Sequence, residues 1–169
     1  DLHSFPTRRS SDLLREKMPD IALRTTFIVG YPGETEADFN ELMEFMEITR
    51  FDHVGVFVFS PEEGTKASTL TPAVPEEIAL DRLNRVLTLQ QQISKENNLK
   101  RIGQTYPVLV MGNSEESDLV YIGRTKFQAP EVDGLTYFGI PEKLPQSGDI
   151  INVRITQALE YDLAGEVEL

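Results

Sequence analysis

A strand–helix–strand pattern in residues 22–59 constrains the fold of this chain more than any other feature. Residues 22–29 (ALRTTFIV) are rich in β-branched side chains, and residues 53–59 (HVGVFVF) form a second, nearly continuous apolar run. Between these runs, four apolar residues repeat at helical spacing: Phe39, Leu42, Met43 and Met46. Because parallel strands need a crossover connection, usually a helix, the pattern predicts a βαβ unit.

Glycine- and proline-rich turns follow both predicted strands, at residues 30–34 (GYPGE) and 60–65 (SPEEGT). Ligands gather where parallel strands end, and glycine lets them approach the backbone. The first turn leads to a helix with Thr35 as predicted N-cap and Asp38 as its partner, a place that favours an anionic group. Two ordinary strand-to-loop connections are the simpler interpretation. Likewise, Glu62 and Glu63 are better explained as a solvated turn than as an acid–base pair.

The chain changes character after Gly103. Before it, Pro75, Glu76 and Glu77 open a long helix, and Gly103 marks the predicted end of that helix. We predict four residues in the buried stripe of that helix: Leu83, Val86, Leu87 and Ile93. After it come five short apolar or alternating runs, which predict a small closed or partly open β-barrel: 106–111, 119–124, 135–140, 149–156 and 163–169. We therefore expect one domain at residues 14–103 and another at 104–169.

Charge and composition exclude several kinds of protein. The chain carries 28 acidic and 16 basic residues, a net charge of −12, which argues against non-specific binding of nucleic acid. Residues 104–169 alone hold 11 acidic and 4 basic residues, a net of −7. Without cysteine, this polypeptide cannot supply thiolate ligands to zinc or iron–sulfur clusters. No apolar run approaches the roughly 20 residues of a membrane helix, so we expect a cytoplasmic protein without membrane association.

Residues 3–13 (HSFPTRRSSDL) resemble the conceptual translation of a common sequencing adapter. They have neither helical nor strand periodicity, so residues 1–13 are predicted to be artefactual and disordered. In this interpretation the natural sequence begins near Leu14, inside a domain.

The order of motifs in the remainder resembles the radical S-adenosylmethionine methylthiotransferases. Residues 25–35 (TTFIVGYPGET) resemble a late strand and turn of that family's barrel, and residues 50–57 (RFDHVGVF) with 60–65 resemble the next strand and loop. Residues 74–77 (VPEE) and 89–94 (LQQQIS) continue the match, and residues 104–169 resemble the family's TRAM module. The resemblance implies an α/β fold class: the C-terminal part of a radical SAM partial (β/α) barrel, followed by a small all-β, OB-like TRAM barrel.

Three places resemble the RimO-type branch of the family, which modifies an aspartate of a small-subunit ribosomal protein. These are Glu62-Glu63, residues 129–134 (APEVDG) and residues 160–165 (EYDLAG). The acidic second domain agrees with a basic ribosomal protein as partner, and makes nucleic acid an unlikely primary target. Two alternatives stay open: a tRNA adenosine methylthiotransferase of the MiaB type, and a non-catalytic interaction module.

The resemblance also implies cofactors and site residues. The full-length enzyme would use S-adenosylmethionine, two iron–sulfur clusters and an electron donor. The cluster ligands are absent from this chain, which is therefore expected to be inactive alone, with no catalytic or metal-binding residue of its own. Four residues are expected near the cofactor, with plain interior packing as the alternative: Ile28, Gly30, Phe57 and Phe59. Three are expected to contact the substrate, with a turn-forming role for residues 130–134 as the alternative: Glu131, Asp133 and Tyr161.

Overall fold

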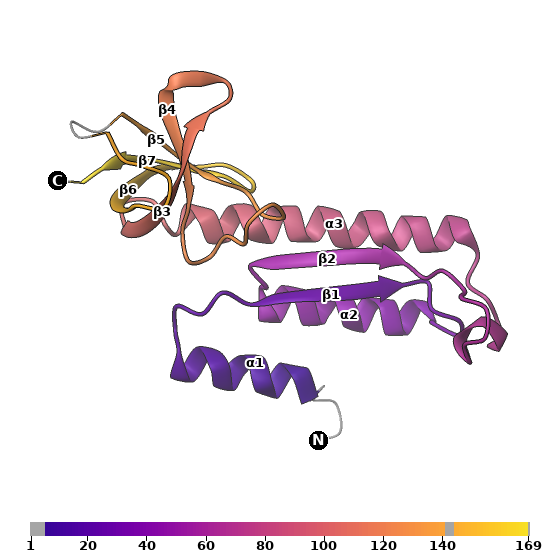
Figure 1. Ribbon diagram of the computed structural model, residues 1–169. Coiled ribbons are helices and arrows are strands. Elements are labelled where there is room, and N and C mark those ends of the chain that lie inside the picture. Colours follow the sequence, from indigo (N-terminus) through magenta and orange to yellow (C-terminus); the bar gives the residue numbers. More distant parts are fainter. Residues whose placement is uncertain (1–5, 141–143, 169) are drawn as a thin grey trace. The chain divides into compact units, whose positions relative to one another are not determined.

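The structure is a computed structural model that describes residues 6–140 and 144–168, and it divides into two units (Figure 1). The α/β unit (Asp1–Ile93) contains α1 (Pro6–Lys17), β1 (Arg24–Val29), α2 (Glu36–Thr49), β2 (His53–Val58), the 3₁₀ helix η1 (Ala67–Thr69) and most of α3 (Glu76–Leu99). The barrel unit (Ser94–Leu169) contains β3 (Thr105–Ser114), β4 (Ser117–Arg124), β5 (Thr136–Gly139), β6 (Ile150–Ala158) and β7 (Leu163–Val167). No described helix is long and apolar enough to cross a membrane.

The predicted βαβ unit is confirmed. Strands β1 and β2 pair in parallel, with Ile28 opposite Phe57, and helices α2 and α3 run beside them (Figure 1). One face of the two strands packs against both helices. The core there consists of five buried residues: Val29, Phe39, Met46, Val86 and Ile93. The other face carries Ile28, which is 57% exposed, and Phe57, which is 62% exposed.

The start of α2 follows the sequence prediction. The hydroxyl of Thr35 accepts a hydrogen bond from the backbone N–H of Asp38, and the Asp38 carboxylate accepts one from the N–H of Thr35 at 2.8 Å. This reciprocal capping box satisfies two amides that the first helical turn leaves without partners. The helix ends at Thr49, where Arg50 takes a left-handed conformation (φ 50°).

The prediction of disorder before Leu14 is wrong for the described residues, because Pro6–Lys17 forms helix α1. Arg15 anchors α1, because its guanidinium donates hydrogen bonds to the carbonyl oxygens of Thr49 and Arg50 at the end of α2. Once one helical turn is fixed, each further residue adds a backbone hydrogen bond, so the helix extends towards the N-terminus. Residues 3–5 lie outside the described residues.

Helix α3 differs from its predicted form at two points. It ends at Leu99, and Gly103 (φ 82°) instead starts the link to the barrel by donating its N–H to the carbonyl of Ile155 at 2.8 Å. Leu87 was expected in the buried stripe, but it is 44% exposed. The buried positions follow the steps of three and four residues that keep to one helix face: Ala79, Arg82, Val86, Gln90 and Ile93.

The five predicted strands of the second domain are confirmed and form a closed barrel in the order β3-β4-β5-β7-β6. All neighbouring strands are antiparallel except β5 and β7, which pair in parallel. Alternate residues point inward and make a core of seven buried side chains: Val108, Val110, Tyr121, Phe138, Val153, Ile155 and Leu163. Among the residues described, closure pairs each of the five strands with a neighbour on both sides.

Candidate functional site

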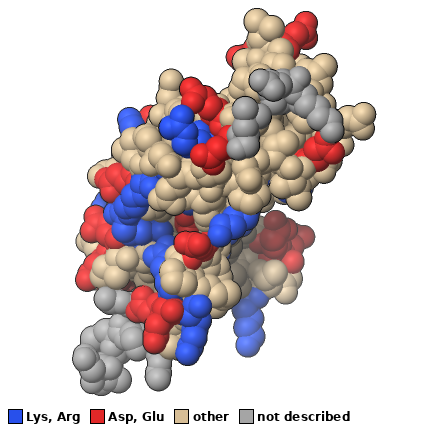
Figure 2. Space-filling model, turned by 90° about the vertical axis from the view of Figure 1, so that its left-hand side faces the viewer, with Lys and Arg blue, Asp and Glu red and all other residues tan. Residues whose placement is uncertain are grey.

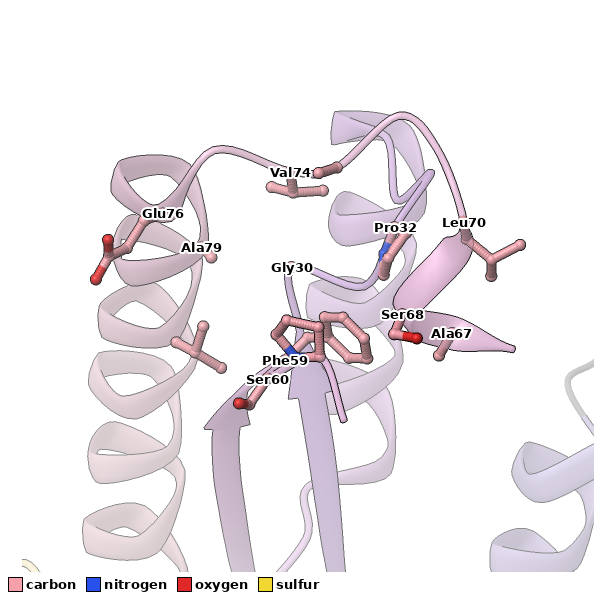
Figure 3. A pocket seen from close by; sticks show the side chains of 13 residues that line it. Gly30, Pro32, Phe59, Ser60, Ala67, Ser68, Leu70, Val74, Glu76 and Ala79 are labelled. Atoms are coloured by element: carbon pink, nitrogen blue, oxygen red, sulfur yellow. The ribbon is translucent and has the colours of Figure 1, made fainter. Parts of the chain in front are cut away.

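A cavity of about 390 Å³ lies at the carboxyl ends of β1 and β2 (Figure 3). Three segments line it: the turn after β1, the loop after β2 and the first turns of α3. The lining residues are Gly30, Pro32, Val58, Phe59, Ser60, Pro61, Ala67, Ser68, Leu70, Ala73, Val74, Glu76 and Ala79. Glu76 is the single ionisable residue in this set, and its carboxylate points away from the cavity (Figure 3). The pocket is therefore mainly apolar, with serine hydroxyls as its polar groups.

The turn after β1 is held in shape by Gly30 and Glu34. Gly30 has a φ of 76° and lies against α3 so closely that a Cβ there would come within 2.6 Å of the Ala79 Cβ. The carboxylate of Glu34 folds back over the turn and accepts the N–H groups of Gly30 (3.0 Å) and Tyr31 (3.3 Å). Arg82, a buried residue of α3, donates to the same carboxylate at 2.7 Å.

The backbone amides of this turn are consumed internally. Besides Gly30 and Tyr31, the N–H of Gly33 donates to the carbonyl of Pro72 and the N–H of Glu34 to that of Tyr31. The anion-binding capacity that a helix N-terminus offers is thus taken up by the Glu34 carboxylate and by the Asp38 cap. The turn after β1 therefore offers no cradle of free amides to a phosphate group.

The loop after β2 closes the other side of the pocket. Its short helix η1 is built on Thr65, whose hydroxyl donates to the Glu62 carbonyl at 2.8 Å and accepts from the Ser68 N–H at 3.3 Å. The hydrogen bond from Gly33 to Pro72 (2.8 Å) ties the loop to the turn after β1. Glu62 and Glu63 are both exposed, as expected of a solvated turn.

The four predicted cofactor contacts lie in two places. Gly30 and Phe59 line the pocket, and the ring of Phe59 packs edge-on against Tyr31 with 5.1 Å between centroids. Ile28 and Phe57 lie on the exposed face of the two strands, directly opposite each other. Interior packing within the described residues does not account for these two side chains, since both are more than half exposed.

The predicted substrate contacts lie on two neighbouring loops of the barrel unit. The loop at residues 129–134 contains Glu131 and Asp133, and the turn at residues 159–162 contains Tyr161. The two meet at Gly134, where an added Cβ would overlap the carbonyl of Tyr161. Glu131 is exposed, in a left-handed conformation (φ 66°), and Tyr161 is 49% exposed. Asp133 instead closes its own loop, because its carboxylate accepts the N–H of Ala129 at 2.6 Å.

Exposed apolar side chains accompany these acidic residues. Val132 is 69% exposed and Leu159 is 55% exposed. Together with the exposed residues Glu131, Glu160 and Tyr161, they form what we call the loop surface. Nearby, burial and then the charges of Asp162 and Glu116 raise the pKa of Tyr137. On the face of the molecule in Figure 2, acidic and basic side chains lie interspersed among broad uncharged areas.

Sequence reasoning missed Arg82 and Asp162. Arg82 occupies a position of the buried stripe of α3, so a charged residue among stripe positions was the available signal. Asp162 belongs to no motif that marks it as functional. Its Oδ1 nevertheless accepts the N–H of Leu135 at 2.7 Å and so joins the two barrel loops. His53, at the start of β2, lies at the opposite end of the strand from the pocket. Among the described residues, no three His, Cys, Asp or Glu side chains are grouped as a metal site would require.

Comparison with known proteins identifies the second unit first. Residues 102–167 match the TRAM domain family. The chain is 46% identical over 154 residues to the ribosomal protein uS12 methylthiotransferase RimO of Anaeromyxobacter sp. (strain Fw109-5), which covers 91% of the chain and 32% of that relative. It is 49% identical over 156 residues to the RimO protein of Pelotomaculum thermopropionicum, with 92% and 35% covered.

These matches confirm the resemblance to the methylthiotransferases that the motifs indicated. The chain is homologous to ribosomal protein uS12 methylthiotransferases over about nine-tenths of its length. It spans about a third of the length of these curated relatives.

Proposed function

We propose that this chain is the C-terminal part of a radical S-adenosylmethionine methylthiotransferase. In this proposal residues 14–103 are the last part of the partial (β/α) barrel, and residues 104–169 are the TRAM module. The complete protein replaces a hydrogen on the β-carbon of an aspartate in ribosomal protein uS12 with a methylthio group. It works in the cytoplasm with a separate electron donor. The observation that carries the proposal is the identity of 46–49% to uS12 methylthiotransferases over 91–92% of the chain.

The pocket fits the adenosyl part of S-adenosylmethionine. That group has a flat aromatic base, ribose hydroxyls and no phosphate, and the pocket combines Phe59 with a turn whose amides are already occupied. Ser60 supplies a hydroxyl group for the polar edge of such a ligand, and Ser68 supplies an acceptor oxygen, since its hydroxyl donates to the Thr65 carbonyl at 2.8 Å. The cofactor, when bound, supplies the hydrogen abstraction at the substrate carbon. Gly30 and Phe59 orient it, and Ile28 and Phe57 shield the reacting centre from water on the strand face.

The iron–sulfur clusters of the complete enzyme do not fit this chain. The sequence has no cysteine, and the described residues contain no grouped set of alternative ligands. We therefore expect that the 169-residue chain, incubated with iron and sulfide under reducing conditions, shows no cluster absorbance and no methylthiotransferase activity. A stable four-iron signal from this chain would contradict the proposal that the cluster ligands lie outside it.

The TRAM module supplies substrate recognition in this proposal. Its net charge of −7 complements a basic ribosomal protein, and its loop surface combines Glu131 and Glu160 with the exposed apolar residues Val132 and Leu159. Such a surface suits a partner segment that presents both basic and apolar side chains. Tyr161 adds an aromatic ring with a hydroxyl at its edge, a type of residue that is enriched in interfaces.

Substrate choice is tested by binding. The 169-residue chain, labelled and titrated with purified uS12 and separately with tRNA, is expected to bind uS12 more tightly. Glu131→Lys with Glu160→Lys should weaken this binding at least tenfold, whereas Glu41→Lys with Glu44→Lys, on α2 of the other unit, controls for the change in net charge. Preference for tRNA would instead support an adenosine-modifying enzyme, and binding would then weaken steeply with salt.

A further inference from the structure

Glu34 and Arg82 lie behind the pocket wall, and the proposed chemistry gives neither of them a role. The side chain of Glu34 is 14% exposed and that of Arg82 is 5% exposed. One carboxylate oxygen of Glu34 accepts both turn amides, and the other is 2.7 Å from Nη1 of Arg82. Arg82 also donates to the backbone carbonyl of Glu34 at 3.3 Å. A residue 48 positions away in the sequence therefore fixes the shape of this turn.

Stability alone does not explain a buried ion pair at this place. Arg82 stands between Ala79 and Val86 in the buried stripe of α3, where an apolar side chain would pack without losing hydration. Removing two charges from water costs about as much as their attraction returns, so such pairs contribute little net stability. The Nε of Arg82 is buried and has no hydrogen-bond partner among the described residues, which adds to the cost. The pair must serve the geometry of the turn.

That geometry is the wall of the pocket. Gly30 and Ala79 both line the cavity and touch each other, and Arg82 follows Ala79 by one helical turn. Helix α3 thus holds the turn at two points, by a close contact at Gly30 and by a charge-assisted hydrogen bond through Glu34. We propose that Glu34 and Arg82 are a positioning pair that holds the Gly30–Tyr31 backbone in the conformation that forms the pocket wall and binds the ligand. The identity of the ligand, S-adenosylmethionine, rests on the proposed function.

Arg85 provides a matched control on the same helix. It is also an arginine paired with a carboxylate, at 2.9 Å from Glu36, and it lies over the ring of Phe39 at 4.4 Å. Its side chain is 39% exposed, and no described hydrogen bond joins it to the turn after β1. Glu36 also lies 3.4 Å from Nη2 of Arg82, so Arg85→Met removes a more exposed ion pair beside the same arginine while it leaves the Arg82–Glu34 bond in place.

The first test uses the 169-residue chain and amide hydrogen exchange measured by NMR. In Arg82→Met, exchange at Gly30 and Tyr31 should become at least tenfold faster relative to the amides within β1, and in Arg85→Met it should not. If Arg82→Met is poorly folded, Glu34→Gln with Arg82→Met removes the unpaired buried charge and keeps an acceptor oxygen for both amides. Exchange should stay fast in that double variant, because the turn still lacks its bond to α3. Equal exchange in the two single variants, or recovered protection in the double variant, overturns the proposal.

The second test uses the complete protein and equilibrium binding of S-adenosylmethionine. Arg82→Met should raise the Kd at least tenfold, Arg85→Met should leave it within twofold, and the double variant should bind as weakly as Arg82→Met. Unchanged affinity in Arg82→Met, alongside normal binding by the parent protein, overturns the positioning role. If the parent protein does not bind S-adenosylmethionine, the proposed cofactor is wrong, and the exchange measurement still decides whether the pair positions the turn.

Discussion

At the scale of single residues, the barrel depends on a few positions where two backbones nearly touch. Gly134 joins the loop at residues 129–134 to the turn at residues 159–162, and an added Cβ would overlap the carbonyl of Tyr161. Gly165 is similarly placed against the carbonyl of Arg154. Glycine is required at Gly134 by this close approach, since its neighbours are backbone atoms that cannot move aside like a flexible side chain.

We expect Gly134→Ala to destabilise the barrel by about 2–3 kcal/mol, at the upper end of what overpacking costs, because backbone must shift. The measurement is urea denaturation followed by circular dichroism. Gly139→Ala is the control, since a Cβ at Gly139 meets nothing within 4 Å and its φ is not positive. Equal stability of the two variants would mean that the loops separate easily, and that the loop surface is not a fixed one.

Some residues of the candidate site could be predicted from the sequence, and others could not. Gly30 and Phe59 were expected near the cofactor from the family resemblance; both line the pocket, and their contact with a cofactor stays a prediction. Arg82 escaped prediction because its partner, Glu34, is distant in the chain. A turn-forming role for residues 130–134 was the open alternative for Asp133, and the hydrogen bond from Ala129 fits that alternative, while the substrate contact stays a prediction.

At the scale of elements, helix α2 shows how local sequence sets both a boundary and a pH dependence. Hydrogen bonds from the hydroxyl and then the backbone N–H of Thr35 lower the pKa of Asp38 below its ordinary value. A carboxylate with a lowered folded-state pKa adds stability above its unfolded pKa, roughly 3.9 for aspartate. That stability is lost as the pH falls through the folded-state pKa.

We therefore expect Asp38→Asn to flatten the acid limb of the stability curve. In the parent chain, the free energy of unfolding should fall between about pH 4 and the lower folded-state pKa, because the unfolded state binds more protons there. The variant lacks this titrating carboxylate and should therefore lose less stability over that pH range. The measurement is urea denaturation at a series of pH values. Glu41→Gln, which removes one charge from the same helix without breaking the cap, should keep the slope of the parent.

Element type was predictable wherever a short stretch carries its own pattern. The strands of the βαβ unit, the cap of α2 and all five barrel strands were placed within a few residues. Helix α1 and the exposure of Leu87 were not predicted. Both depend on tertiary contacts, since Arg15 bonds the end of α2 and the strands decide which face of α3 is buried.

At the scale of the whole molecule, each unit has its own core. The barrel is closed, and seven buried side chains fill it. The segment before β3 belongs with it, because Gly103 donates to the carbonyl of Ile155 and Asn98 donates to that of Leu159. The α/β unit, by contrast, leaves Ile28 and Phe57 exposed on a two-stranded sheet.

We expect residues 94–169 to fold alone with a cooperative unfolding transition. In this fragment, Ile155→Ala should cost about 2–5 kcal/mol, because Ile155 is fully buried in the core. Ile150→Ala, on the same strand but 70% exposed, should change stability by no more than about 0.5 kcal/mol. Thermal and urea denaturation measure both. A fragment without a cooperative transition, or with the same loss in both variants, would show that the barrel core does not stand by itself.

The sequence by itself determined the properties that depend on near neighbours. Apolar periodicity gave the strands and helices, Thr35 and Asp38 gave a helix start, and the order of motifs gave the relationship to the methylthiotransferases. Only the tertiary structure decided that Arg82 meets Glu34, that Gly134 meets Tyr161 and that β5 lies beside β7. The physical reason is that local conformation follows from steric and hydrogen-bonding preferences over a few residues. Contacts between distant segments exist only once the complete fold brings them together.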